Sequence, residues 1–124
     1  MRFAKLWFVL LLAVLVLPVW GQTQHSVTVG FTGYVQSPTD TATSANFYRS
    51  TTSGGPYAKL NATPVPIVSA AAQFVDTAGV GGTKYFYVAT AVDAGGNEST
   101  FSNEASATFL ANPAAPAGVT ATSK

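Results

Sequence analysis

The sequence contains a single histidine, His25, which is the first place to look for acid–base or nucleophilic chemistry. A Ser-His-Asp arrangement would need a serine beside the imidazole and a carboxylate that orients it. His25 lies beside the expected start of the exported chain, on the flank of a short strand pattern, which is typical of a surface residue. No nucleophile–base pair or carboxylate pair stands at a spacing that indicates hydrolysis, so we assign no catalytic residue and interpret the chain as non-enzymatic.

The segment "DAGGNE" offers a candidate group of oxygen ligands for a metal ion. Asp93, Asn97 and Glu98 fall within six residues, and such side chains bind Ca²⁺ in other proteins. Their spacing fits no standard calcium loop, whereas the paired glycines suit a tight hairpin turn. We therefore interpret the segment as a turn, and we assign neither a metal nor any other cofactor.

Three tyrosines are candidates for an exposed aromatic surface. Tyr34, Tyr48 and Tyr57 could contact a glycan or a protein, since rings of this kind are common at binding surfaces. The alternative is that Tyr48 and Tyr57 cover a face of a sheet. A row of coplanar, exposed rings would favour carbohydrate binding, and the sequence offers only scattered candidates.

The N-terminus has the pattern of a secretory signal peptide. Arg2 and Lys5 precede an apolar run over residues 6–20, and small residues lead up to a cleavage site before Gln22. The alternative is an uncleaved anchor, but this run is shorter than the roughly 20 apolar residues that a spanning helix needs. We expect a helical signal peptide over residues 1–21, export to the cell envelope or outside, and membrane contact only if the segment stays uncleaved.

Charge and cysteine content narrow the class of protein further. Four basic and five acidic residues follow residue 21, and the basic ones are not clustered. Binding to nucleic acid requires clustered Lys and Arg, so we exclude it. The chain has no cysteine, and an exported domain without disulfides must be stable through packing alone.

Apolar residues after the leader alternate with period two in short bursts between turn residues, and no sustained helical period is present. This pattern predicts an all-β sandwich rather than a helical fold, with a small barrel as the alternative. The strongest strand pattern is "TKYFYVATAVD" at 83–93, which is apolar on both faces and so typical of a central strand. The other five expected strands lie in the segments "HSVTVGFTG", "ANFYRS", "PYAKLN", "AAQFVDT" and "SNEASATF".

Two segments carry a resemblance to a known family: "FYRSTTSGGPYAKLN" at 47–61 and "TKYFYVATAVDAGGNESTFSNEASATF" at 83–109. Over residues 25–110 the chain resembles a fibronectin type III domain of the kind found in secreted bacterial proteins. The resemblance implies an immunoglobulin-like sandwich of six to seven strands, with strands A, B and E packed on C, C′, F and G. It also implies a hydrogen bond from the Tyr85 hydroxyl to the corner between strands E and F. The expected core aromatic residues are Phe31, Phe47, Phe74, Tyr85 and Tyr87.

A segment that matches the family's first strand, strand A, is missing before strand B, but a similar segment lies near the C-terminus. Few residues separate the expected cleavage site from strand B, whereas "PAAPAGVTAT" at 113–122 resembles the opening of such a domain. We therefore expect a domain over 22–110 without strand A, and a Pro/Ala-rich tail over 111–124. The tail is a disordered stub, a strand A for its own domain, or a strand A donated to a second copy. The donor residues in the last two interpretations are Ala117, Gly118, Val119, Thr120, Ala121 and Thr122.

These observations predict a secreted non-catalytic module that acts as a structural spacer or as a protein-interaction domain. The alternative is a carbohydrate-binding accessory module of a polysaccharide-degrading system. The expected partners are a protein or a cell-surface polysaccharide, together with head-to-tail self-association through the tail.

Overall fold

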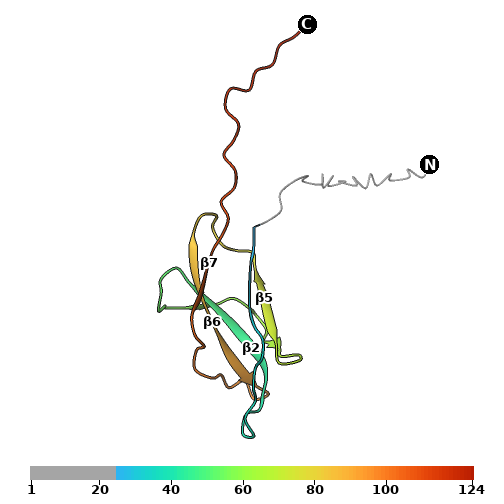
Figure 1. Cartoon of the computed structure of the whole chain (residues 1–124), viewed down its shortest axis with the longest axis vertical. Helices are drawn as coiled ribbons and strands as arrows, with labels where there is room; N and C mark the ends of the chain where they lie inside the picture. Colours follow the sequence, from blue (N-terminus) through green and yellow to red (C-terminus); the bar gives the residue numbers. More distant parts are fainter. Residues whose placement is uncertain (1–24) are drawn as a thin grey trace, which may run out of the picture.

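The computed structural model describes residues 25–124, and every regular element in that range is a strand (Figure 1). None of the described residues forms a helix that is long and apolar enough to cross a membrane. The expected signal peptide lies outside the described residues. The strands are β1 (Val27–Phe31), β2 (Ala42–Ser50), β3 (Ala58–Lys59), β4 (Val65–Pro66), β5 (Ala72–Asp76), β6 (Lys84–Asp93) and β7 (Ala105–Thr108).

The strands form two antiparallel sheets, as the all-β prediction requires. One sheet pairs β1 with β5, and the other has the order β3-β2-β6-β7. These are the B–E and C′–C–F–G pairings that the family resemblance implies. The sequence pattern missed β4, whose Val65 and Pro66 pair with the start of β2. A strand of two residues that contains a proline has too little alternation to be recognised.

Aromatic side chains fill the space between the sheets. The Phe47 ring is fully buried, and its centroid lies 6.1 Å from that of Phe31 and 6.4 Å from that of Phe74. A second cluster joins Tyr85 and Tyr87 to Phe109, which is 1% exposed. Of the five expected core aromatic residues, Phe47, Tyr85 and Tyr87 are buried. Phe31 of β1 and Phe74 of β5 are only half-buried.

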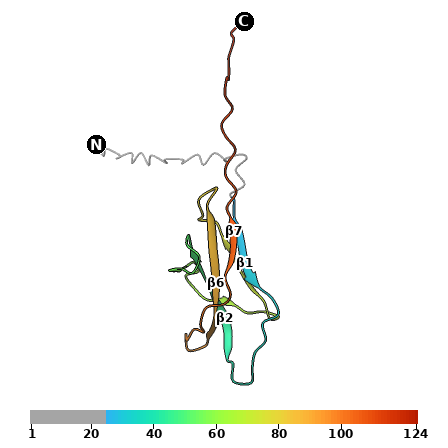
Figure 2. The ribbon, with the colours of Figure 1, turned by 60° about the vertical axis from the view of Figure 1, so that its left-hand side comes forward.

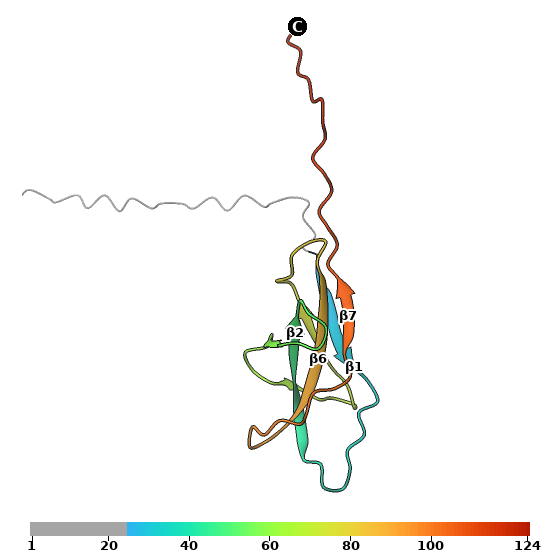
Figure 3. The ribbon, with the colours of Figure 1, turned by 90° about the vertical axis from the view of Figure 1, so that its left-hand side faces the viewer.

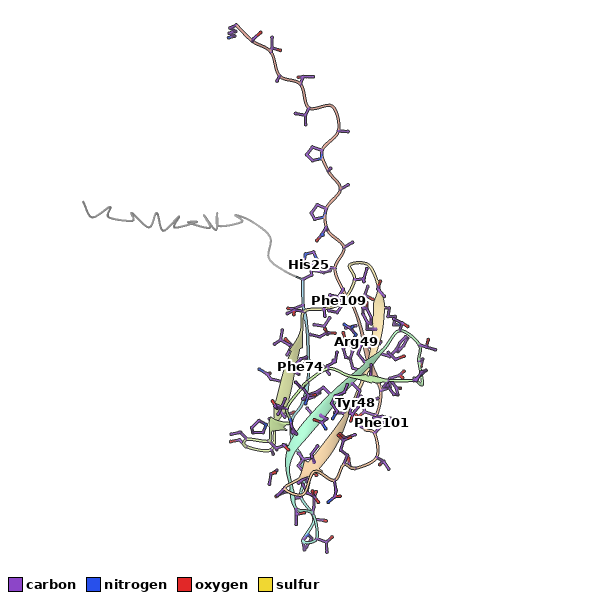
Figure 4. All side chains as sticks on the ribbon, turned by 180° about the vertical axis from the view of Figure 1, so that it is seen from behind. His25, Tyr48, Arg49, Phe74, Phe101 and Phe109 are labelled. Atoms are coloured by element: carbon purple, nitrogen blue, oxygen red, sulfur yellow. The ribbon has the colours of Figure 1, made fainter. Side chains whose placement is uncertain are left out.

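Phe109 is a core residue that sequence reasoning did not identify, because it follows the end of the last strand. Its ring packs against the turn before β6, where a Cβ on Gly79 would lie 2.1 Å from the Phe109 ring. A glycine is required here by the close approach of the ring. Figure 4 shows Phe109 near the end of the sandwich where the chain leaves it.

The chain enters and leaves the sandwich at the same pole. His25 Nδ1 donates a hydrogen bond of 2.6 Å to the carbonyl of Leu110, so the entry to β1 lies beside the exit from β7. From there the tail, residues 111–124, extends away along the long axis of the molecule (Figures 1 and 3). All tail residues are exposed, and none of them belongs to a strand.

Candidate functional site

A buried ion pair connects the two sheets. Arg49 of β2 and Asp76 of β5 both point inward, and the Arg49 Nη1 atom donates to both carboxylate oxygens at 3.0 and 2.9 Å. The Asp76 side chain is 1% exposed and that of Arg49 is 22% exposed. Asp76 also accepts hydrogen bonds from the Tyr87 hydroxyl and from the Ala78 backbone N–H. These contacts satisfy a buried charge, so we assign this group a structural role.

Tyr85 closes the corner before β6. Its hydroxyl accepts a hydrogen bond of 3.0 Å from the Val80 backbone N–H. This contact is the one that the family resemblance implies for Tyr85. The Arg49 guanidinium lies 4.5 Å from the centre of the Tyr85 ring, which adds a cation–π contact to the ion pair.

Glu98 is the hub of a polar group on the outer face of the larger sheet. Its carboxylate accepts hydrogen bonds from the side chains of Tyr48, Asn46 and Thr90, and Lys59 Nζ lies 3.6 Å away. The pKa of Glu98 is lowered, first by the Tyr48 hydrogen bond and then by the Asn46 hydrogen bond, against an opposing effect of burial. The carboxylate therefore stays ionised and holds the segment between β6 and β7 against the sheet.

Glu104 has the same function at the turn after β2. It accepts hydrogen bonds from the Gly54 backbone N–H at 2.7 Å, from the Ser53 hydroxyl at 2.6 Å and from Tyr57. The Gly54 hydrogen bond is the main reason that the pKa of Glu104 is lowered. The contact ties the turn over residues 52–56 to the start of β7.

The segment predicted to be a turn rather than a calcium loop folds as a turn. Asp93 Oδ1 accepts hydrogen bonds of 2.9 Å from the backbone N–H groups of Gly95 and Asn97. The Asn97 side-chain amide also donates to the Asp93 carboxylate, and this contact is the first cause of the lowered pKa of Asp93. Glu98 is engaged with β2 instead, so the three oxygen-bearing side chains do not converge. The described part of the chain contains no group of three metal-binding side chains.

Tyr34 and Asp40 close the loop between β1 and β2. The Tyr34 hydroxyl donates to Asp40 at 2.5 Å, and the Ala42 backbone N–H donates to the same carboxylate at 2.9 Å. The Tyr34 hydrogen bond is the main cause of the lowered pKa of Asp40. The Tyr34 ring packs against Phe31 with centroids 5.8 Å apart, so Tyr34 lies apart from the other two candidate tyrosines.

Tyr48, Tyr57 and Phe101 form an outer aromatic cluster on the larger sheet. Phe101 meets Tyr48 at 5.1 Å and 72°, and it meets Tyr57 at 5.2 Å and 68°. These are edge-to-face contacts, so the three rings do not form one plane. Phe101 is 51% exposed, and Figure 4 shows it beside Tyr48. The sequence analysis did not include Phe101 among the candidate surface residues. The available signal was an aromatic residue in the polar segment between a turn and a strand.

The other residues singled out in the sequence have simpler surroundings. His25 lies at the surface, where its ring bonds the main chain at Leu110. The six candidate donor residues over 117–122 are exposed, and the structure pairs them with nothing. Donation of this segment as a strand therefore stays a prediction.

Comparisons with known proteins find one similar sequence and two similar solved structures, all from bacteria. No family model matches the chain. Over 82 residues the chain is 44% identical to an amylopullulanase from Thermoanaerobacter thermohydrosulfuricus, covering 66% of this chain and 5% of that protein. A solved Fn3-like protein from Clostridium thermocellum is 29% identical, with 77% of this chain and 85% of that chain covered and a TM-score of 0.49. A beta-1,2-glucanase from Parabacteroides distasonis is 26% identical, with 73% and 12% covered and a TM-score of 0.52.

The fold is a fibronectin type III-like sandwich. The B–E and C′–C–F–G strand pairings are those that the family resemblance implies. The chain resembles the fibronectin type III domains of bacterial proteins, as the sequence segments indicated. It spans 5% of the amylopullulanase and 12% of the glucanase.

Proposed function

We propose that this chain is an exported, non-catalytic fibronectin type III-like module that serves as a structural or protein-interaction domain in a polysaccharide-degrading system. The similarity to segments of an amylopullulanase and a beta-1,2-glucanase supports the polysaccharide context. The signal-peptide pattern supports export to the cell envelope or outside.

The observation that carries the proposal is the use of all five carboxylates of the chain as structural acceptors. Hydrolysis of glycosides normally uses a pair of carboxyl groups, one of which is a general acid with a raised pKa. Here the pKa values of Asp40, Asp93, Glu98 and Glu104 are lowered by hydrogen bonds within the fold. Asp76, the fifth, is buried in the ion pair with Arg49. The carboxylates are thus suited to fastening loops rather than to proton transfer.

The outer aromatic cluster supports a protein-interaction or structural role over carbohydrate binding. A sugar ring stacks on the flat face of an aromatic side chain, and a polysaccharide needs several such faces in one plane. The Phe101 ring instead stands at 72° and 68° to its two tyrosine neighbours. The hydroxyls of Tyr48 and Tyr57 are held by Glu98 and Glu104, which fixes the rings in this arrangement.

Binding and hydrolysis assays on the exported chain test the proposal. In native gels containing starch, pullulan or β-glucan, we expect its mobility to match that of a non-binding reference protein, with no release of reducing ends. Two variants isolate the surface: Phe101→Ala removes the centre of the outer aromatic cluster, and Tyr34→Phe changes an aromatic residue elsewhere. Retardation that Phe101→Ala abolishes and Tyr34→Phe preserves would establish the carbohydrate-binding alternative, and release of reducing ends would establish an enzyme.

A further inference from the structure

An apolar groove runs along one side of the sandwich, between β1 and the strands that face it. Val29 and Phe31 of β1 form one wall, and Ala89, Ala91 and Ala105 lie on the other. The groove has a volume of about 360 Å³. Figure 2 and Figure 3 both show β1 beside β7 on this side of the molecule.

The groove borders the core. Phe47 and Tyr87 contribute to its lining and are themselves buried, at 0% and 2% exposed. Val29 and Phe31 point into the sandwich but are only half-buried. Inward-facing residues of a central strand would be covered on both sides, so the core of the described domain is open along this edge.

The backbone of β1 is unpaired on the same side. Within residues 25–124, β1 pairs with β5 alone. Alternate residues of an antiparallel strand direct both their N–H and C=O groups to the same side, so a row of these groups faces the groove. Such an edge is a template for another strand.

The tail of the chain contains a segment suited to this edge. Ala117, Val119 and Ala121 alternate with Gly118, Thr120 and Thr122, which places small apolar side chains on one face of an extended strand. The Val119 side chain is free to enter a groove, since the residue is 83% exposed. No proline interrupts these six residues, so every backbone N–H can donate. Six residues extend about 20 Å and β1, with five residues, about 17 Å, so the two strands match in length.

The direction of the tail decides which copy it would join. The tail leaves at the pole where β1 begins, and a strand antiparallel to β1 must start at the opposite pole. To pair with its own β1 in this way, the tail would have to return the full length of β1 through residues 111–116. Six residues reach at most about 20 Å when straight, which leaves nothing for the two reversals. Pro113 and Pro116 also favour an extended segment.

From these observations we propose that residues 117–122 insert as a strand into the groove of a second copy of this chain, antiparallel to β1. The tail already extends along the long axis, which is the direction in which that strand must run (Figure 3). Each copy then donates at one pole and accepts along its side, so the contact is head-to-tail and does not close on itself. The product is a linear assembly, and this inference goes beyond the function proposed above.

Sedimentation equilibrium of the exported full-length chain tests the proposal, with two matched tail variants. Val119→Asp places a charge on the face that enters the groove, and Thr120→Asp places the same charge on the solvent face one residue along. Both positions are exposed in the single chain, so neither variant disturbs the sandwich. A strand this short buries little area and binds weakly, so concentrations from about 10 µM to about 1 mM are needed.

We expect the average mass of the wild type and of Thr120→Asp to rise at least about twofold over this range, while Val119→Asp stays monomeric. Val119→Asp still offers its groove, so its addition to the wild type shortens the assemblies. Backbone amides of β1 gain protection from hydrogen exchange in the wild type only when it is associated. A wild type that is monomeric throughout overturns the proposal, as does equal association of all three proteins. A monomeric wild type that melts higher than Val119→Asp shows that the tail covers its own sandwich instead.

Discussion

Replacing Arg49 with methionine removes the cation of the buried ion pair and keeps a side chain of similar reach. Methionine is unbranched and fills about the same space as the aliphatic part of the arginine side chain. The Asp76 carboxylate, 1% exposed, then keeps the hydrogen bonds from the Tyr87 hydroxyl and the Ala78 N–H but has lost its cation. A buried charge that loses its partner costs heavily, because the low dielectric that strengthened the pair now penalises the single ion.

The magnitude follows from the burial of the two partners. Breaking a buried pair from one side costs about 3–5 kcal/mol. Arg49 is 22% exposed and two donors to Asp76 remain, so we expect the lower end of this range, about 3 kcal/mol. In a domain of this size about 1 kcal/mol shifts the melting temperature by about 4–8 °C. Thermal unfolding followed by circular dichroism is therefore expected to show a drop of about 12–24 °C for Arg49→Met.

A second substitution at Asp76 tests the cause of that loss. In the wild type, Asp76→Asn removes the charge that Arg49 needs and is expected to destabilise the fold. In the Arg49→Met background the same change removes the unpaired charge, so it is expected to raise the melting temperature. The opposite sign of one substitution in two backgrounds is specific to a coupled ion pair. A loss of less than about 4 °C for Arg49→Met, or the same sign in both backgrounds, would refute the reasoning.

Three further expectations concern the core and its tyrosines. Tyr85→Phe removes the acceptor of the Val80 N–H and should lower the free energy of unfolding by about 1 kcal/mol in urea titrations, whereas an unchanged midpoint would show that the corner bond is dispensable. Gly79→Ala places a Cβ 2.1 Å from the Phe109 ring and should cost about 1–3 kcal/mol or more in the same assay, with partial recovery when Phe109→Leu is added; full stability of the single variant would contradict this contact. Burial, followed by the Asp76 hydrogen bond, raises the pKa of Tyr87 in the folded state above its unfolded value of about 10. The stability that this protonated tyrosine contributes is therefore complete below about pH 10 and is lost as the pH rises through the folded-state pKa, so urea midpoints should fall above pH 10 less steeply in Tyr87→Phe than in the wild type.

The regular part of the fold could be predicted from the sequence because its signals are local. The alternation over residues 83–93 marked β6 as a strand buried on both faces, and Tyr87, Val88 and Val92 are all buried. The family segments supplied the sheet order and the role of Tyr85. The six strands that were recognised all carry several residues of alternation or a turn signal at their ends.

The contacts that were missed depend on tertiary structure. Phe109 lies outside its strand, and contacts with Tyr85 and with Gly79 of another turn bury it. Phe101 comes from an irregular segment that is held against the sheet by Glu98 and neighbouring backbone bonds, which no periodicity records. Arg49 and Asp76 are distant in the sequence. A charged residue on an inward face interrupts the apolar alternation of its strand, so the pattern alone does not predict that it is buried with a partner.

The central claim is that the outer aromatic cluster is part of the fold and that the module does not bind polysaccharide. Thermal unfolding of the exported chain with and without soluble maltooligosaccharides and β-glucan oligosaccharides tests this most directly. Binding at one hundred times the dissociation constant would stabilise the fold by about 2.7 kcal/mol, which corresponds to about 11–22 °C. We expect the melting temperature to be unchanged by the sugars and to fall in Phe101→Ala because a packed ring is lost. A rise with sugar that disappears in Phe101→Ala would contradict the account and assign the cluster to carbohydrate binding.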